Sequence, residues 1–219
     1  MISDDQIGLL ARYVDQLLDW NRKVNLISRQ DEELVWQNHI LHSISLLFKI
    51  TLKQHPVVMD LGTGGGLPGL PLKIVLPDAE FLLVDSTKKK VAAVEDMLRN
   101  LDLKGITAVW GRAEELAREQ TLQYHFDYII ARAVAPLSDL IDWSLLFLRP
   151  SKASRLQTVG EVRRVQSPAL IALKGGDLEQ EIERAHRTGK TSSIEVVDLV
   201  FPGSEEISLS GKKIVIVTF

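Results

Sequence analysis

The stretch Val57-Val58-Met59-Asp60-Leu61-Gly62-Thr63-Gly64-Gly65-Gly66-Leu67-Pro68-Gly69 decides the fold of this chain. It begins as a short apolar strand, ends that strand in a carboxylate, and passes through a glycine-rich turn into a helix. Glycines let the backbone adopt positive φ and approach a ligand closely, and the start of the helix offers free N–H groups. After the first strand of an alternating α/β sheet, such a turn is where a nucleotide-like cofactor binds.

Several interpretations of this turn compete. A P-loop requires Lys and then Ser or Thr after its last glycine, and Leu70-Pro71 excludes it. A dinucleotide fingerprint fits Gly64-x-Gly66-x-x-Gly69, with Asp85 about 20 residues further on as the ribose-binding acid. Glycines needed only for packing are a further alternative.

The remaining interpretation also uses the first acid of the turn. The pattern Asp60-x-Gly62-x-Gly64-x-Gly66, with Asp85 ending the next strand, resembles motif I of S-adenosylmethionine-dependent methyltransferases. By this resemblance Asp60 faces the side of the cationic cofactor, and Asp85 binds its ribose hydroxyls.

Length and composition fit one globular α/β domain with a small addition, since the chain has 219 residues, of which 45% are hydrophobic and 25% charged. No apolar run approaches the roughly 20 residues that span a bilayer. The acidic start Met1-Ile2-Ser3-Asp4-Asp5 is unlike a signal peptide. We therefore expect a cytoplasmic protein with no membrane partner.

The chain contains no cysteine, which excludes disulfides, thiolate zinc sites and a cysteine nucleophile. Although His39 and His42 share a helix face, the five histidines are not spaced as a metal cluster, so we expect no metal. The net charge of −3 does not indicate nucleic acid, but local basic clusters can meet phosphates. These clusters are Lys88-Lys89-Lys90, Lys152 with Arg155, Arg163-Arg164 and Lys212-Lys213.

Hydrophobic periodicity predicts alternating strands and helices. Strands are expected at 57–60, 80–85, 105–110, 126–131, 169–173, 194–200 and 213–219. Helices are expected at 4–20, within 31–50, and at 69–76, 87–102, 113–120, 136–147 and 177–187. Strands separated by helices favour a parallel sheet, and the short link before the last strand favours a C-terminal antiparallel hairpin. Residues 151–168 are expected to form a long, net-positive surface loop.

Further blocks along most of the chain resemble one family. They are Trp20-Asn21, Asn25-Leu26, His39-Ile40-Leu41 with Ser43, residues 60–72, Leu83-Val84-Asp85-Ser86 with Lys90, Arg112-Ala113-Glu114-Glu115, Ala131-Arg132-Ala133-Val134-Ala135 and Leu173-Lys174-Gly175. Together with the glycine turn, they resemble the RsmG (GidB) family of small-subunit ribosomal RNA guanine-N7 methyltransferases. The Leu-Pro-Gly extension of the turn and the Arg-Ala-Val-Ala block are the specific parts of this resemblance.

The resemblance implies S-adenosyl-L-methionine as cofactor and small-subunit (16S) rRNA or the 30S particle as partner. It implies a cofactor site built from Asp60, Gly62, Gly64, Gly66, Leu67, Asp85, Ala113, Glu114 and Arg132. The chain departs from the family at Asn38 and His42, where the family often has Arg and Asp. These departures concern contacts on the RNA side, where Asn21 and Asn25 are also candidates unless they only cap loops.

The chemistry of this reaction fits the chain. Guanine N7 carries a lone pair and no proton, so methyl transfer to it requires positioning and no general base. Arg132 and Lys174 end the fourth and fifth strands, and both are expected to face the reaction crevice. Our hypothesis is that Arg132 borders the cofactor and that Lys174 holds guanine O6 or a nearby phosphate.

The sequence thus predicts a Rossmann-like α/β methyltransferase sheet, mostly parallel with a C-terminal antiparallel hairpin. Residues 1–55 are expected to form an N-terminal helical extension, and residues 56–219 the methyltransferase domain of a monomer. Two other functions stay open: methylation of a small molecule, and nucleotide binding without catalysis by an interaction protein. A dinucleotide-dependent oxidoreductase is a weaker alternative.

Overall fold

Among the residues that the structure describes, seven strands form the main sheet. A computed structural model describes residues 2–150, 157–159, 162–201, 203–204 and 211–219. The strands are β2 (Val57–Leu61), β3 (Glu80–Asp85), β4 (Ile106–Trp110), β5 (Tyr128–Arg132), β8 (Ala169–Gly175), β9 (Ser193–Asp198) and β10 (Lys212–Thr218). Their order is β4-β3-β2-β5-β8-β10-β9, with only the pairs of β10 antiparallel. The predicted parallel sheet with a C-terminal hairpin is therefore confirmed.

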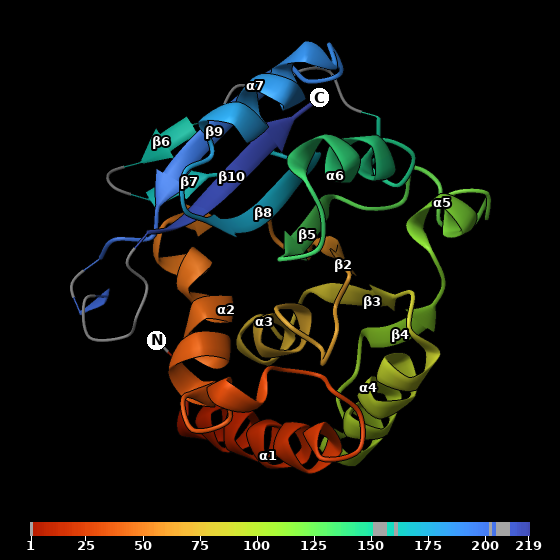
Figure 1. Cartoon of the computed structure of the whole chain (residues 1–219), viewed down its shortest axis with the longest axis vertical. Coiled ribbons are helices and arrows are strands. Elements are labelled where there is room, and N and C mark those ends of the chain that lie inside the picture. The colour runs from red at the N-terminus through yellow and green to blue at the C-terminus, as the bar shows by residue number, and fades with distance from the viewer. Residues whose placement is uncertain (1, 151–156, 160–161, 202, 205–210) are drawn as a thin grey trace.

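Helices connect these strands and cover both faces of the sheet (Figure 1). They are α3 (Gly69–Val75), α4 (Lys88–Leu101), α5 (Ala113–Leu116), α6 (Leu137–Ser144) and α7 (Glu179–Arg187). Helices α5 and α6 are shorter than the sequence predicted. Because both faces are covered, the strands are apolar on both sides, as expected for a parallel sheet. In β8, Leu173 packs on the side of α3 and α4, whereas Ala172 packs on the side of α6.

The N-terminal segment extends the layer on the α3 and α4 side. Helix α1 (Asp4–Asn21) starts with a capping box in which Ser3 and Gln6 bond each other's backbone N–H, and it buries Tyr13 and Leu17. Figure 1 shows α1 below α3 and beside α4. Buried α1 side chains belong to the same hydrophobic core as α3 and α4. The division of the chain after residue 55 stays a prediction.

Short and irregular elements follow α1, in place of the regular helices expected within 31–50. They are the 3₁₀ turn η1 (Arg29–Asp31), the π-helix η2 (Trp36–Leu41), α2 (His42–Ile44), the 3₁₀ turn η3 (Ser45–Phe48) and the short strand β1 (Ile50–Thr51).

Strand β1 is the edge of a second, three-stranded sheet. It pairs in parallel with β7 (Val162–Arg164), which pairs antiparallel with β6 (Gln157–Val159). The prediction of a loop over 151–168 was therefore wrong for β6 and β7. Strand β7 pairs with β1, which at two residues is too short to be recognised from the sequence. Residues 151–156 and 160–161, including Lys152 and Arg155, lie outside the described residues. Among the described residues, no helix is long and apolar enough to cross a membrane.

Asp127, just before β5, bonds to side chains and backbone from distant parts of the chain. Its side chain is 2% exposed and accepts hydrogen bonds from Lys53 Nζ at 2.7 Å, Arg149 Nη1 at 2.9 Å and the backbone N–H of Val57 at 2.9 Å. A buried carboxylate requires such partners, because it has lost its hydration. This cluster fixes where β2 and β5 begin.

Replacing Asp127 with Ala should therefore destabilise the fold. Two half-exposed cations and one backbone donor lose their shared acceptor, and we expect a loss of about 2–3 kcal/mol in the free energy of unfolding. Urea unfolding measures this loss. The matched control is Glu183→Ala, which removes an exposed pair with Arg187 in α7 and should leave the midpoint unchanged. Equal midpoint shifts for both variants would contradict the assigned role of Asp127.

Candidate functional site

The glycine turn between β2 and α3 lies against the end of β3. The N–H groups of Gly62 and Thr63 both donate to the carbonyl oxygen of Val84, each at 2.8 Å. Gly62 and Gly64 have φ angles of 77° and 58°, a region that disfavours side chains. The turn thus needs glycine at these positions to bend over the carboxyl end of the sheet.

Asp60 lies inside this turn and is fully buried. Its Oδ2 atom accepts a hydrogen bond from Thr63 Oγ1 at 2.6 Å and another from the N–H of Gly69 at 2.8 Å. Burial raises the pKa of Asp60 to about 6, against the lowering effect of these two bonds. The sequence placed Asp60 on the cofactor side of the turn, but the structure places it behind the turn, where it joins the end of β2 to the start of α3.

A pocket of about 610 Å³ opens over this turn, and we call it the main pocket because it holds most of the predicted cofactor residues. This size is within the range of about 300–1,000 Å³ common for small-molecule sites. Five of the predicted cofactor residues line it: Gly62, Gly64, Leu67, Asp85 and Arg132. Gly66 does not, because it faces Leu70 and the hydroxyl of Tyr13.

Ala113 and Glu114, at the start of α5, line a side pocket of about 130 Å³. The side pocket and the main pocket share Gly62, Asp85, Ser86 and Val134. Asp85 is the last residue of β3, and its carboxylate accepts from the N–H groups of Gly64 at 2.9 Å and Thr87 at 2.8 Å. The structure therefore sets Asp85 at the junction of the two pockets.

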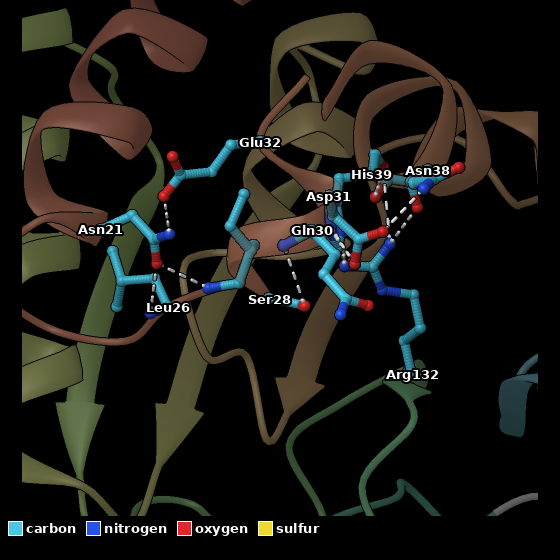
Figure 2. A network of polar contacts seen from close by, with 11 residues as sticks. Asn21, Leu26, Ser28, Gln30, Asp31, Glu32, Asn38, His39 and Arg132 are labelled. Carbon is cyan, nitrogen blue, oxygen red and sulfur yellow. Dashed lines mark hydrogen bonds and ion pairs between the residues drawn. The ribbon is translucent and has the colours of Figure 1, made fainter. Parts of the chain in front are cut away.

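Arg132 ends β5 and extends towards the N-terminal segment (Figure 2). Its Nη2 lies 3.1 Å from His39 Nδ1, and its Nη1 donates to the carbonyl oxygens of Asn38 at 3.4 Å and His39 at 3.5 Å. Burial lowers the pKa of Arg132, although arginine stays charged in proteins. Within the described residues, no carboxylate forms an ion pair with Arg132.

His39 and His42 also line the main pocket, from η2 and α2. Burial and then the charge of Arg132 lower the pKa of His39 to about 4 and that of His42 to about 3. Both imidazoles are therefore neutral at neutral pH. The sequence pattern does not assign these histidines to the site, because their place in it depends on contacts with the distant Arg132. In the part of the chain that the structure describes, no group of three or more His, Asp or Glu is placed to hold a metal ion.

Lys174 does not line the main pocket. It lies in a second pocket of about 780 Å³, which adjoins the main pocket along Ala133 and Val134. Its Nζ donates to the carbonyl oxygen of Ala135 and to Glu181 Oε1, both at 2.6 Å. Glu181 Oε1 also accepts from the N–H of Leu137 at 2.6 Å. The structure thus places Arg132 and Lys174 in two adjoining pockets, and a contact of Lys174 with the substrate stays a prediction.

Asn21 caps the loop after α1, one of the two roles considered for it. Its Oδ1 accepts from the N–H groups of Leu26 at 2.7 Å and Ile27 at 2.9 Å, and its Nδ2 donates to Glu32 at 2.6 Å (Figure 2). Leu26 and Ile27 line the main pocket. The buried amide therefore shapes the pocket wall. Asn25 is exposed, and a contact of its side chain with RNA stays a prediction.

Comparison with known proteins identifies relatives over most of the chain. Residues 6–209 match the family described as GidB, rRNA small subunit methyltransferase G. The ribosomal RNA small subunit methyltransferase G of Bacteroides fragilis is 39% identical over 180 residues, which cover 82% of this chain and 80% of that protein. The protein of the same name from Chlorobium luteolum is 38% identical over 202 residues, which cover 92% of this chain and 74% of that protein.

Solved structures with a similar fold are far more distant in sequence. Fibrillarin from Aeropyrum pernix, in complex with natively bound S-adenosyl-L-methionine, has a TM-score of 0.58 and 14% identity, covering 83% of this chain and 75% of that chain. A SAM-dependent methyltransferase from Aquifex aeolicus has a TM-score of 0.56 and 13% identity, covering 86% of this chain and 94% of that chain. At these identities the likeness shows the fold alone, an α/β methyltransferase sheet.

Asp60→Asn should remove a pH dependence of stability. Because burial raises the pKa of Asp60 from 3.8 to about 6, the folded chain keeps a proton that the unfolded chain releases between these values. The unfolded state then binds fewer protons, so this contribution to the free energy of unfolding falls as pH rises, by roughly 3 kcal/mol once pH exceeds the folded pKa.

Urea unfolding of the wild type and the Asp60→Asn variant between about pH 4 and pH 7 measures this dependence. The wild type should lose stability relative to the variant as pH rises. Other titrating groups act equally in both proteins and cancel in the difference. A difference that stays constant over this range would contradict the assigned burial of the carboxyl group.

Proposed function

The chain belongs to the rRNA small subunit methyltransferase G (RsmG/GidB) family, and from this premise we propose how its pockets serve methyl transfer from S-adenosylmethionine to guanine N7 of 16S rRNA. It is an S-adenosylmethionine-dependent methyltransferase that acts on small-subunit rRNA. The observation that carries the proposal is the meeting of the glycine turn, Asp85 and Arg132 around one pocket.

The residues of the two pockets fit the cofactor. Asp85, at their junction, has carboxylate lone pairs to accept the ribose hydroxyls. From there the side pocket with Ala113 and Glu114 suits the base, and the main pocket suits the methionine portion. Arg132, a buried cation with no ion-pair partner among the described residues, suits the α-carboxylate. When bound, the cofactor supplies an electrophilic methyl group on a positively charged sulfur.

The acceptor side of the main pocket needs no general base. Guanine N7 has a free lone pair and no proton to remove. The residues beyond Arg132, among them Asn38, His42 and Lys212, are therefore proposed to receive and orient the base and to exclude water. The loop after β5 reads Ala133-Val134-Ala135-Pro136 and lacks the Asp/Asn-Pro-Pro-aromatic sequence typical of enzymes that methylate exocyclic amines.

Lysines at the edge of the main pocket suit contacts with the RNA backbone. Lys90, at the start of α4, and Lys212, at the start of β10, both line the pocket. Phosphate contacts of this kind position a protein on RNA without reading its sequence. We propose that the protein acts as a monomer in the cytoplasm, on the 30S particle or its rRNA.

Transfer of radiolabelled methyl groups tests this function. The protein is incubated with labelled S-adenosylmethionine and with total RNA or 30S particles from cells that lack it, and the product nucleoside is identified. We expect labelled 7-methylguanosine in small-subunit rRNA. Cofactor binding without transfer to either substrate would instead favour a small-molecule acceptor or a protein without catalysis. RNA from wild-type cells, already methylated, is the matched control.

Lys174→Ala should lower the rate of methylation by about tenfold and leave cofactor affinity unchanged. The hypothesis from the sequence attributes this loss to a contact with guanine O6 or a phosphate. The contacts of Lys174 with Ala135 and Glu181 favour a loss through displacement of the loop at residues 133–136. Steady-state methylation assays and calorimetry measure the two quantities.

Glu181→Ala separates the two explanations for Lys174. It removes one of the two acceptors of Lys174 and the acceptor of the Leu137 N–H, but it leaves the lysine charge in place. A comparable loss of rate in this variant supports the positioning of the loop. An unchanged rate supports direct contact of Lys174 with the substrate. Full activity of Lys174→Ala would contradict both.

A further inference from the structure

Arg132 is held by a segment that lies more than ninety residues away in sequence. His39 contacts it from η2, a single π-helical stretch of six residues. Such stretches are rare and occur frequently at functional sites. Figure 2 shows the guanidinium of Arg132 directed at His39 and Asn38, with Asp31 beside them.

The chemistry of arginine fixes the tautomer of His39. A guanidinium has five N–H donors and no acceptor, so His39 Nδ1, at 3.1 Å from Arg132 Nη2, must be the acceptor. The imidazole proton then lies on Nε2. Asp31 Oδ2 lies 3.4 Å from that nitrogen, near enough to attract its proton but without hydrogen-bond geometry, and the other oxygen of Asp31 accepts from Asn38 Nδ2 at 2.7 Å. Asp31, His39 and Arg132 thus form a directed series of polar contacts.

We propose that His39, oriented by Asp31, is a positioning residue that aims the Arg132 guanidinium at the main pocket. This inference rests on the proposed function in one respect, that Arg132 binds the α-carboxylate of the cofactor. His39 acts through Arg132 and need not touch the cofactor itself.

The distances show why His39 is needed. The other two acceptors of Arg132 are backbone oxygens at 3.4 and 3.5 Å, so the contact with His39 is the shortest that holds the guanidinium. Losing it leaves a buried charged donor without its acceptor and frees the side-chain torsions. A ligand must then order the side chain on binding, which weakens affinity.

Calorimetric binding of S-adenosylhomocysteine, the demethylated cofactor, tests the proposal in a double-mutant cycle. His39→Ala should weaken binding about tenfold, and Arg132→Ala should weaken it at least as much. Because His39 acts through Arg132, the double variant should bind no more weakly than Arg132→Ala alone. His39→Asn places an amide oxygen near the position of Nδ1, and it should restore most of the affinity.

His186→Asn, a change at an exposed histidine of α7, is the matched control and should bind as the wild type does. Thermal unfolding of every variant checks that the fold is kept. If His39→Ala does not fold, the comparison of His39→Asn with Asp31→Ala and Asp31→Asn carries the test, since Asp31→Ala removes the carboxylate beside His39 Nε2 and Asp31→Asn keeps an oxygen there.

Additive losses in the double variant, or equal losses for His39→Ala and His39→Asn, would overturn the proposal. An unchanged affinity of Arg132→Ala for S-adenosylhomocysteine would also overturn it, because Arg132 would then not bind the cofactor and its orientation by His39 would not matter. The measured quantity is binding of the cofactor product, and it requires no RNA. A failure to methylate rRNA would therefore reject the proposed function without changing the outcome of this cycle.

Discussion

The carboxylate of Asp60, enclosed by the turn that it holds, is the constraint on which the rest of the site depends. It accepts from Thr63 and from the N–H of Gly69, and so joins the end of β2 to the start of α3. A Cβ atom on Gly69 would lie 2.7 Å from Asp60 Oδ2 and 2.4 Å from Leu83 Cδ2. Because only glycine fits there, α3 can start close to β2 and β3, and the glycine turn before it lines the pocket.

The N-terminal segment forms the part of the pocket wall that the glycine turn does not. The Tyr13 hydroxyl donates to the carbonyl oxygen of Gly65 at 2.9 Å, and a Cβ on Gly65 would lie 2.8 Å from Leu17 Cδ1. Helix α1 therefore packs directly on the glycine turn, and the capped loop after it supplies Leu26 and Ile27 to the pocket wall. Without the N-terminal segment, the pocket would be open to solvent on the side of Leu26 and Ile27. Both the sheet and the N-terminal helical layer are therefore needed to form the site.

The features that depend on interactions between neighbouring residues could be predicted from the sequence. Strands with apolar residues on both faces, the glycine turn and the acid ending β3 all follow from patterns within a few residues, and Asp85 lies where its strand-end position predicted. Contacts between distant segments were not predictable in this way. Lys174 was assigned to the crevice because it ends a strand, but its direction is set by Glu181 and the loop after β5. Likewise β7 pairs with β1, a two-residue strand that is too short to show a pattern of its own, and β6 pairs with β7.

Charge explains why the site buries two neutral histidines beside a cation. The cofactor brings a positive sulfur, so charged imidazoles beside Arg132 would oppose its binding. Burial and the nearby Arg132 keep His39 and His42 uncharged at neutral pH. Arg132 can remain charged because it meets a neutral acceptor on His39 and leaves donors for a carboxylate. The acids Asp31 and Asp85, both lining the pocket, then supply the negative charge that a cationic cofactor requires, without pairing with the arginine that must bind its carboxylate.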